Sequence, residues 1–334
     1  MCIRDRIEDV VMGCAYPEGA TGFNIGRNAA IAAGCPSSTS GMTVNRYCSS
    51  GLQAIAIAAG RVMNEGVPIM AAGGVESISL VQFGNPNMTN ATEKELFKRM
   101  PALWMTMIET AEIVADRYNV SRESQDEFAL LSQQRTAAAQ EAGLYDNEIV
   151  PLATTMKVVD KETKEASFHE VVADRDDCNR PETTLEGLQS LQPVFKDGQQ
   201  VKEGKFVTAG NASQFSDGAS ASIVMSAEEA EKRGLEPLGA FRGFAVHGCD
   251  PDEMGIRASF ALLFVFIGIS LFLGIEAILG AFLAGALFAF VFRNTGPLEA
   301  RLTGLAYGFF IPVFFINVGI QFPLEALGDW SVLG

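Results

Sequence analysis

The chain has 334 residues, a length typical of about two or three domains. Its 40 acidic and 25 basic residues give a formal net charge of −15, which argues against a nucleic-acid partner because no excess of basic side chains is present to neutralise phosphates. The six cysteines form no Cys-x-x-Cys pair. Neither a metal site of the zinc type nor a disulfide framework is therefore favoured, and a reduced compartment is expected.

Strands and helices alternate along the first part of the chain. Residues 1–6 contain no apolar segment of the signal-peptide kind, and we interpret them as a leader scar outside the fold. The following residues predict, in order, strand Val10–Gly13, helix Asn24–Ala33, strand Gly41–Asn45, helix Ser50–Asn64 and strand Pro68–Ala72. This alternation predicts an α/β fold with a parallel sheet and helices on its faces.

Cys48 stands at the turn between a predicted strand and a predicted helix. The unpaired N–H groups and the positive dipole end of a helix favour a thiolate at such a position. The same N–H groups can hold the oxyanion of a carbonyl that the sulfur attacks. A free cysteine among small residues is also often a buried structural residue, so the local sequence leaves both interpretations open.

The pattern changes after Gln82 and returns at Phe206. In between, predicted helices at Glu109–Arg117 and Ser121–Ala142 alternate with polar, irregular segments. The chain then predicts a strand at Ser222–Met225 and a helix at Ala227–Arg233. We expect Ser222–Met225 to join the sheet of the first strands, with the residues in between forming an insert.

Several motifs carry a resemblance to a known family. Asn45–Ala54 reads Asn-Arg-Tyr-Cys-Ser-Ser-Gly-Leu-Gln-Ala, and further motifs lie at Met12–Pro17, Gly73–Ser77, Arg180–Thr184 and Thr208–Ser213. Together they resemble the degradative thiolases (3-ketoacyl-CoA thiolase, acetyl-CoA acyltransferase) over residues 7 to about 255. The resemblance implies three parts. Residues 7–84 and 206–235 form an N-terminal layered α/β domain, residues 85–205 form an inserted loop domain, and residues 236–257 are a remnant of the C-terminal domain. The strand and helix that open the family's first domain have no counterpart here, so the match is truncated at both ends.

The resemblance implies a site for coenzyme A thioesters. Cys48 matches the family's acyl-accepting nucleophile, and Met107, Ala209 and Ser213 match residues that contact the pantetheine arm of coenzyme A. Ile108 stands where the family has glycine. Judged from the residues alone, Met107 is equally well a helix-packing residue, and Ser213 a turn or capping serine. No permanently bound cofactor is implied, since coenzyme A is part of the substrate, and a homodimer through the N-terminal domain is the implied assembly.

The other catalytic groups of the family have no match in the chain. A thiolase also uses a histidine from a Gly-His-Pro motif, a second cysteine and an Asn-Glu-Ala-Phe motif, all in its C-terminal domain. The chain has two histidines, His169 and His247, and neither lies in a Gly-His-Pro context. We interpret both as solvated or structural. Without a base, Cys48 keeps only the activation that its helix supplies, so we expect no measurable thiolase turnover.

Composition changes abruptly after residue 257. The tail from Ala258 onwards contains no lysine and few charged residues, namely Glu276, Arg293, Glu299, Arg301, Glu325 and Asp329. Its apolar runs predict about three transmembrane helices, with Leu302–Phe322 as the third. We therefore expect membrane attachment through residues 258–322, with the thiolase part cytoplasmic. The alternative is a buried helical hairpin of a soluble domain. We reject it, because the C-terminal domain of a thiolase is α/β with strands and charged helix faces, and the tail has neither.

The tail carries a second resemblance. Gly280–Gly285 and Phe310–Gly319, with Pro312 and Asn317 at predicted membrane depth, resemble late transmembrane helices of Kef-type monovalent cation:proton antiporters. Glu276 is interpreted as an interfacial charge.

Three hypotheses follow from the two resemblances. The chain is a thiolase-family acyltransferase of the fatty-acid β-oxidation type, a membrane antiporter fragment, or a chimeric open reading frame with neither activity intact. The thiolase-like sequence stops inside a domain, and the antiporter-like sequence starts inside a helical bundle. Because natural fusions join at domain boundaries and exposed linkers, this favours the chimera over the other two hypotheses.

Overall fold

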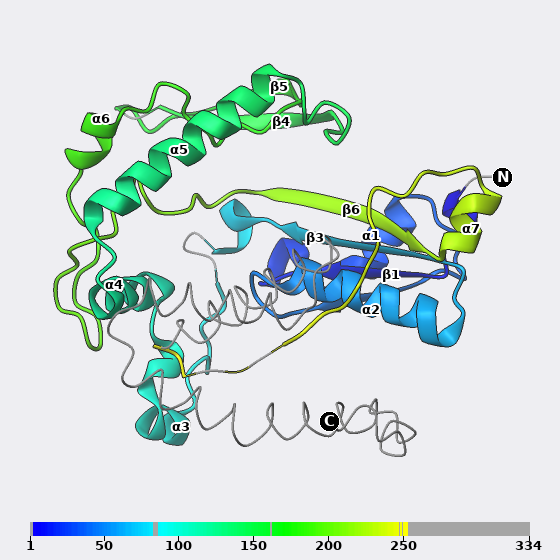
Figure 1. Cartoon of the computed structure of the whole chain (residues 1–334), viewed down its shortest axis with the longest axis horizontal. Coiled ribbons are helices and arrows are strands. Elements are labelled where there is room, and N and C mark those ends of the chain that lie inside the picture. Colours follow the sequence, from blue (N-terminus) through cyan, green and yellow to red (C-terminus); the bar gives the residue numbers. More distant parts are fainter. Residues whose placement is uncertain (1–2, 83–85, 161, 247, 249, 253–334) are drawn as a thin grey trace, which may run out of the picture. The chain divides into compact units, whose positions relative to one another are not determined.

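The computed structural model describes residues 3–82, 86–160, 162–246, 248 and 250–252 of the chain, and Figure 1 labels their helices and strands. The helices are α1 (Ile25–Ala32), α2 (Ser50–Glu65), α3 (Lys94–Arg99), α4 (Met107–Tyr118), α5 (Arg122–Glu141), α6 (Leu185–Gln189) and α7 (Ala227–Lys232). The strands are β1 (Asp9–Gly13), β2 (Ser40–Val44), β3 (Ile69–Glu76), β4 (Leu152–Val159), β5 (Ala166–Ala173) and β6 (Gly218–Met225).

These residues belong to two compact units. Of the described residues, the first unit takes those within 3–104, 122–194 and 207–246. The second takes 105–121, 195–206 and those described between 248 and 252.

A four-stranded sheet in the order β2-β1-β3-β6 organises the first unit. β1 pairs parallel with both β2 and β3, and the predicted strands and helices of this region are confirmed. β6 pairs antiparallel with β3 along its whole length, from Ile69 opposite Met225 to Glu76 opposite Gly218 (Figure 1). The expectation that Ser222–Met225 joins the sheet is therefore confirmed. The first strands pair parallel as predicted, and β6 adds an antiparallel strand at the edge.

Apolar clusters lie on both faces of the sheet. Because successive strand residues point to opposite faces, Val10 contributes to one cluster and its neighbour Val11 to the other. The first cluster includes Ala30 of α1, and the second includes Ala54 and Ala58 of α2. α1 and α2 therefore cover opposite faces, as expected for an α/β fold.

Two glycines allow the helices to approach the sheet closely. A Cβ atom on Gly26 of α1 would overlap the carbonyl oxygen of Met42, and a Cβ atom on Gly13 would lie 2.6 Å from the backbone nitrogen of Gly51. Neither space accommodates a methyl group without a backbone shift. The second contact fixes the position of the α2 N-terminus against β1.

The first residues take part in the fold. Ile3–Arg6 forms a short helical turn, Ile3 packs against the cluster that contains Val10, and the Arg4 guanidinium donates to the carbonyl of Ala33 at 3.1 Å. The expectation that residues 1–6 lie outside the fold is therefore corrected for Ile3–Arg6. The partly buried Ile3 and the hydrogen bond from Arg4 both connect this short turn to the rest of the fold.

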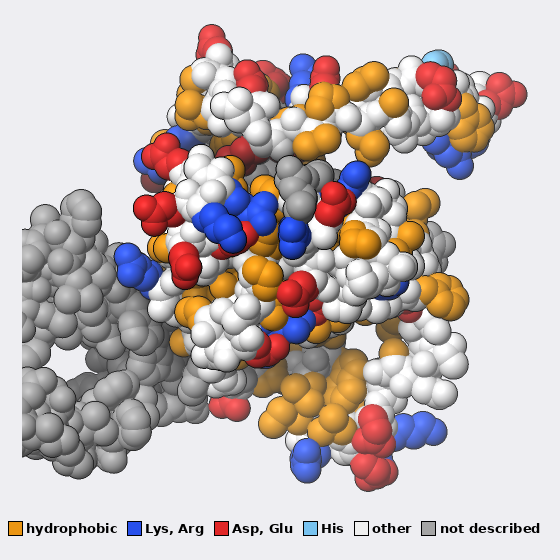
Figure 2. All heavy atoms as spheres, turned by 90° about the vertical axis from the view of Figure 1, so that its right-hand side faces the viewer, with side chains coloured by type: hydrophobic (Ala, Val, Ile, Leu, Met, Phe, Trp, Pro, Cys, Tyr) orange, Lys and Arg blue, Asp and Glu red, His pale blue; other side chains and the backbone are white. Residues whose placement is uncertain are grey.

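The segment after Gln82 contains an unexpected hairpin. α4 and α5 match the predicted helices within a few residues, but β4 and β5 form an antiparallel pair where the sequence indicated irregular structure. Most of their side chains are exposed, including Phe168 at 67% and Leu152 at 63%. The pattern was hard to recognise because an unburied sheet does not show apolar–polar alternation. Figure 2 shows hydrophobic side chains at the surface, interspersed with charged ones.

No helix of the described residues is both long enough and apolar enough to cross a membrane. The predicted spans between residues 258 and 322, with Glu276, lie outside the described residues, as does the whole tail that carries the second resemblance.

Candidate active site around Cys48

Cys48 lies in the loop between β2 and α2, two residues before the first residue of the helix. Its side chain is exposed, whereas Cys14 and Cys35 are buried. The interpretation of Cys48 as a buried structural cysteine is therefore wrong. An exposed sulfur beside the positive end of a 16-residue helix is the arrangement that supports nucleophilic chemistry.

A tight turn presents Cys48. The backbone N–H groups of Ser49 and Ser50 donate to the carbonyls of Arg46 (3.1 Å) and Tyr47 (2.9 Å). The buried Ser50 hydroxyl accepts from the Arg46 N–H at 2.8 Å and donates to the Tyr47 carbonyl at 2.6 Å. Tyr47 has a φ of 45°, in the left-handed region that bulky residues rarely adopt. The turn therefore depends on side-chain contacts to hold Tyr47 in this conformation.

Asn45 and Glu76 connect this turn to the end of β1. The Asn45 amide group donates to the carbonyl of Ala15 at 2.9 Å, and its oxygen accepts from the Tyr47 N–H at 2.8 Å. The Glu76 carboxylate accepts from the Ala15 N–H. The Tyr47 ring meets Tyr16 edge-on, with centroids 6.5 Å apart. Residues at or just beyond the ends of three neighbouring strands thus meet beside the nucleophile.

Cys14 lies at the base of this arrangement. Burial raises the pKa of its thiol, and the nearby Glu76 carboxylate raises the pKa further, against an opposing contact from Thr21. Cys14 is therefore held as a neutral thiol, so it does not compete with Cys48 as a nucleophile.

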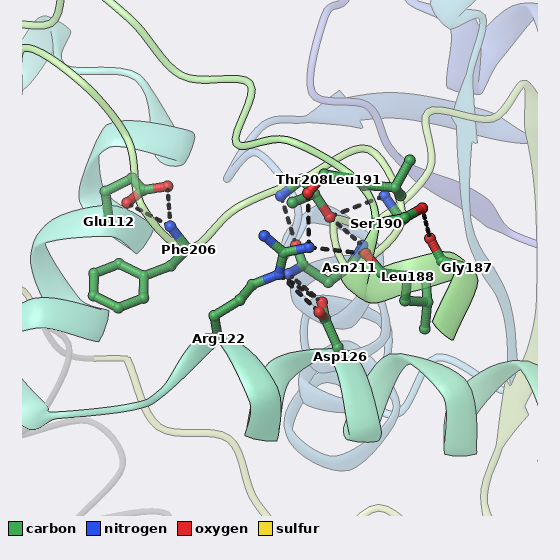
Figure 3. Close-up of polar contacts among 11 residues, drawn as sticks. Glu112, Arg122, Asp126, Gly187, Leu188, Ser190, Leu191, Phe206, Thr208 and Asn211 are labelled. Atoms are coloured by element: carbon green, nitrogen blue, oxygen red, sulfur yellow. Dashed lines mark hydrogen bonds and ion pairs between the residues drawn. The ribbon is translucent and has the colours of Figure 1, made fainter. Parts of the chain in front are cut away.

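Ala209 and Ser213 share an exposed loop. The buried ion pair of Arg122 with Asp126, shown in Figure 3, anchors this loop through Asn211. Asp126, fully buried on α5, accepts from the Arg122 guanidinium at 2.8 and 2.9 Å and from the Asn211 amide at 3.0 Å. The Asn211 oxygen accepts from the Thr208 N–H at 2.8 Å, which closes the loop on itself. The loop that holds Ala209 is thus fixed to α5 by a charge-assisted network.

Arg122 extends the same network to α6. Its second guanidinium nitrogen donates to the carbonyls of Leu188 (2.8 Å) and Leu191 (3.0 Å), and Figure 3 shows these dashed contacts converging on Arg122. One side chain therefore binds both the Asp126 carboxylate and the end of a neighbouring helix. This explains why α5, otherwise polar and exposed, has a buried aspartate near its start.

Met107 lies in the second unit, as the first residue of α4, and is 69% exposed. Two buried carboxylates of the same helix hold the segment 195–206. Glu109 accepts from the N–H groups of Gln200 (2.6 Å) and Val201 (3.0 Å), and Glu112 from those of Lys205 and Phe206 (Figure 3 shows the Glu112 contacts with Phe206). Burial opposes ionisation of Glu109, but these N–H donors outweigh it and hold the pKa of Glu109 below its usual value.

The structure brings only some of the predicted residues together. Ala209 and Ser213 share one loop, Cys48 lies on another loop of the same unit, and Met107 belongs to the other unit. Within the described part of the chain, no hydrogen bond joins Cys48 to Ala209 or Ser213. His169 is exposed on β5, with its Nε2 3.0 Å from the Ser167 hydroxyl, as expected for a solvated histidine. His247 lies outside the described residues.

The residues that support the site were not among those predicted from the sequence. Asn45, Glu76 and Asn211 lie inside the motifs that carry the thiolase resemblance, and this position could have indicated a role in the site. Asp126 lies outside these motifs, so no feature of the sequence pointed to it. Among the described residues, no cluster of three or more histidine, cysteine or acidic side chains could hold a metal ion.

Comparisons with known proteins show that the two parts of the sequence are similar to different families. Residues 3–228 match the family model of the thiolase N-terminal domain, and residues 238–334 match the sodium/hydrogen exchanger transmembrane model. The 3-ketoacyl-CoA thiolase of Bacillus subtilis (strain 168) is 44% identical over 254 residues, which is 75% of this chain and 62% of the relative. The peroxisomal 3-ketoacyl-CoA thiolase of Homo sapiens is 42% identical over 258 residues, which is 77% of this chain and 58% of the relative.

A third relative, the beta-ketoadipyl-CoA thiolase of Pseudomonas putida, is 39% identical over 266 residues, covering 75% of this chain and 62% of the relative. The chain thus spans about three fifths of the length of these relatives. A family model that matches most of the chain, together with these identities, establishes that the chain belongs to the thiolase family.

Proposed function

We propose that the thiolase part acts on acyl-CoA thioesters through Cys48, as in the acyl transfer of fatty-acid β-oxidation. The observation that carries this proposal is the exposed Cys48 thiol at the N-terminal end of α2. The names of the relatives supply the substrate class, since these are 3-ketoacyl-CoA thiolases.

In the proposed step, the Cys48 Sγ thiolate attacks the thioester carbonyl, and a new C–S bond forms. The carbon–sulfur bond to coenzyme A then breaks, and coenzyme A leaves as a thiolate that takes a proton from solvent. The positive end of α2 stabilises both the attacking thiolate and the oxyanion that develops on the carbonyl. The products are an S-acyl-Cys48 enzyme and free coenzyme A.

The coenzyme A contacts are assigned by resemblance to Met107, Ala209 and Ser213. All three are exposed, as contacts with a soluble ligand require. The loop that contains Ala209 is anchored through Asn211 and Asp126, which supports a fixed surface for the ligand. We infer no permanently bound cofactor and a homodimer through the N-terminal domain.

Complete turnover needs groups that the 334 residues do not supply in the family's sequence context, above all a histidine in Gly-His-Pro. General acid–base terms contribute about 10²–10⁴-fold each. We therefore expect the 334-residue chain to be acylated at Cys48 without measurable multiple turnover of acetoacetyl-CoA.

Mass spectrometry of the full chain after incubation with acetyl-CoA tests the proposal. We expect an acetyl group on Cys48 and none in the Cys48→Ala chain. The Cys178→Ala chain is the matched control, because Cys178 is the other exposed cysteine of the described residues. Equal acetylation of Cys48 and Cys178, or no acetylation of Cys48, would contradict a dedicated acyl-accepting role.

The domain assignment forms part of the same proposal. We assign residues 7–84 and 206–235 to the thiolase N-terminal domain, 85–205 to its inserted loop domain, and 236–257 to a remnant of the C-terminal domain. Support comes from the family match over residues 3–228 and from the pairing of β6 with β3.

For residues 258–334 we propose about three transmembrane helices of the antiporter type, with the thiolase part on the cytoplasmic side. The match of residues 238–334 to the sodium/hydrogen exchanger model favours this second function class. Carbonate extraction of membranes from cells that express the full chain tests it, because a spanning chain stays in the pellet and a peripheral one is released. Sequencing the source DNA across codons 250–260 then separates a genomic fusion from a chimeric reading frame.

A further inference from the structure

The motif Gly73–Ser77 and the residue Asn45 have no role in the acyl-transfer step described above. Both nevertheless contact the same residue, Ala15, which follows β1. The Ala15 N–H donates to the Glu76 carboxylate, and the Ala15 carbonyl accepts from the Asn45 amide at 2.9 Å. Ala15 is thus held from both sides by side chains at the ends of the two neighbouring strands.

Asn45 makes a second contact, which reaches the nucleophile loop. Its side-chain oxygen accepts from the Tyr47 N–H at 2.8 Å. Tyr47 precedes Cys48 and has a left-handed φ of 45°. For a residue with a Cβ atom this conformation is strained, so it persists only where the surroundings support it.

Because Tyr47 directly precedes Cys48, a change of its φ to negative values would reorient the peptide that joins the two residues. The contacts with Ser50 begin on the helix side of this turn, and the contact with Asn45 begins on the strand side. Asn45 is therefore the side chain that couples the strand ends to the turn.

We propose that Asn45 is a positioning residue for Cys48: it holds Tyr47 in the left-handed conformation that keeps the sulfur at the end of α2. The inference rests on the proposed function, in that Cys48 is the nucleophile which Asn45 positions. Glu76 supports Asn45 indirectly, by fixing Ala15 from the other side.

Alkylation of the full chain by iodoacetamide, followed cysteine by cysteine with mass spectrometry, tests the proposal. We expect Asn45→Ala to slow alkylation of Cys48 by about 2- to 10-fold, the range that corresponds to one intramolecular hydrogen bond. The exposed Cys178 should keep its rate, and the buried Cys14 and Cys35 should stay protected. Asn64→Ala, an exposed asparagine in the last turn of α2, is the matched control and should change nothing.

A double-mutant cycle with Tyr47→Gly gives the decisive result. Glycine adopts positive φ without strain, so it does not need support from Asn45. We expect Asn45→Ala to slow alkylation of Cys48 in the chain that keeps Tyr47, and to have no further effect on this rate in the Tyr47→Gly chain. An equal effect in both chains, or no effect in either, would overturn the proposal.

The control cysteines separate positioning from folding. If Asn45→Ala exposes Cys14 and Cys35 to alkylation, Asn45 is required for the fold and the positioning role is refuted. Iodoacetamide involves no thioester, so the outcome is independent of acetylation by acetyl-CoA. Absence of acetylation would refute the proposed function and leave the coupling of Asn45 with Tyr47 in place, whereas absence of coupling would refute only the positioning role.

Discussion

Replacement of Asp126 with alanine removes the carboxylate that binds both Arg122 and Asn211. Asp126 is fully buried, and the Arg122 side chain is 17% exposed. Water therefore has little access to the guanidinium and cannot readily replace the lost carboxylate as a hydrogen-bond acceptor. Removal of one partner of a buried ion pair costs about 3–5 kcal/mol. Arg122 keeps its contacts with the carbonyls of Leu188 and Leu191, so we expect the lower end of this range, about 3 kcal/mol.

Hydrogen exchange of the full chain, measured by mass spectrometry, localises this loss. The peptide that covers residues 205–216 should exchange faster in Asp126→Ala, because the Asn211 amide loses this acceptor and the loop opens more often. A loss of about 3 kcal/mol corresponds to an acceleration of about 100-fold, at 1.4 kcal/mol per factor of ten. The β4–β5 hairpin, to which no hydrogen bond or ion pair of Asp126 runs, should exchange as before.

Glu127→Ala is the matched control, because Glu127 is the next residue of α5 and its side chain is exposed. We expect this chain to exchange like the unmodified one. If Asp126→Ala and Glu127→Ala give the same exchange in residues 205–216, the Asp126 network does not hold the loop, and the explanation given for the buried aspartate is wrong.

Three further predictions concern the sheet, the second unit and the cysteines. Gly13→Ala should slow alkylation of Cys48 severalfold, because a Cβ atom there would displace the backbone of Ser50 at the start of α2; a rate equal to that of the unmodified chain would show that the helix adapts. The folded-state pKa of Glu109 is lowered by its N–H donors, so its stabilisation is complete above the usual carboxyl value of about 4.3 and is lost as pH falls through the lower folded value. We therefore expect the hydrogen-exchange protection factors of residues 199–206 to fall on acidification. In Glu109→Gln they should already be about tenfold lower at pH 7 than in the unmodified chain, and equal factors in the two chains at pH 7 would contradict this. In the unmodified chain, Cys48 should react with iodoacetamide far faster than the buried Cys14, whose thiol also has a raised pKa, and the ranking is checked by peptide mass spectrometry.

The sequence predicted the surroundings of Cys48 well, because strand, turn and helix there are defined by neighbouring residues. The strand at Val10–Gly13 and the helix that begins at Ser50 were both confirmed. The contacts that support the nucleophile were not predictable in the same way. Glu76 and Ala15 are 61 residues apart in the chain, and only the fold brings them together.

The antiparallel entry of β6 and the hairpin β4–β5 also escaped prediction. Strand direction within a sheet depends on the path of the connecting chain, which local patterns do not encode. The buried Asp126 escaped for a related reason, since its partner Asn211 lies 85 residues away. In a polar helix such as α5, a single buried acidic residue resembles its exposed neighbours until its partners are known.

The pairing of β3 with β6 has a consequence for the order of folding. Glu76 lies opposite Gly218, so all residues from 77 to 217 form one excursion whose two ends are adjacent. Strands β1 to β3 are complete early in synthesis, and the edge of β3 then waits for a strand made much later. Closing so long an excursion is slow, but each doubling of its length adds only about 0.6 kcal/mol of entropic cost. The segment between the two strands can therefore change length with little penalty, whereas β6 must reach the ribosome exit before the sheet edge is protected.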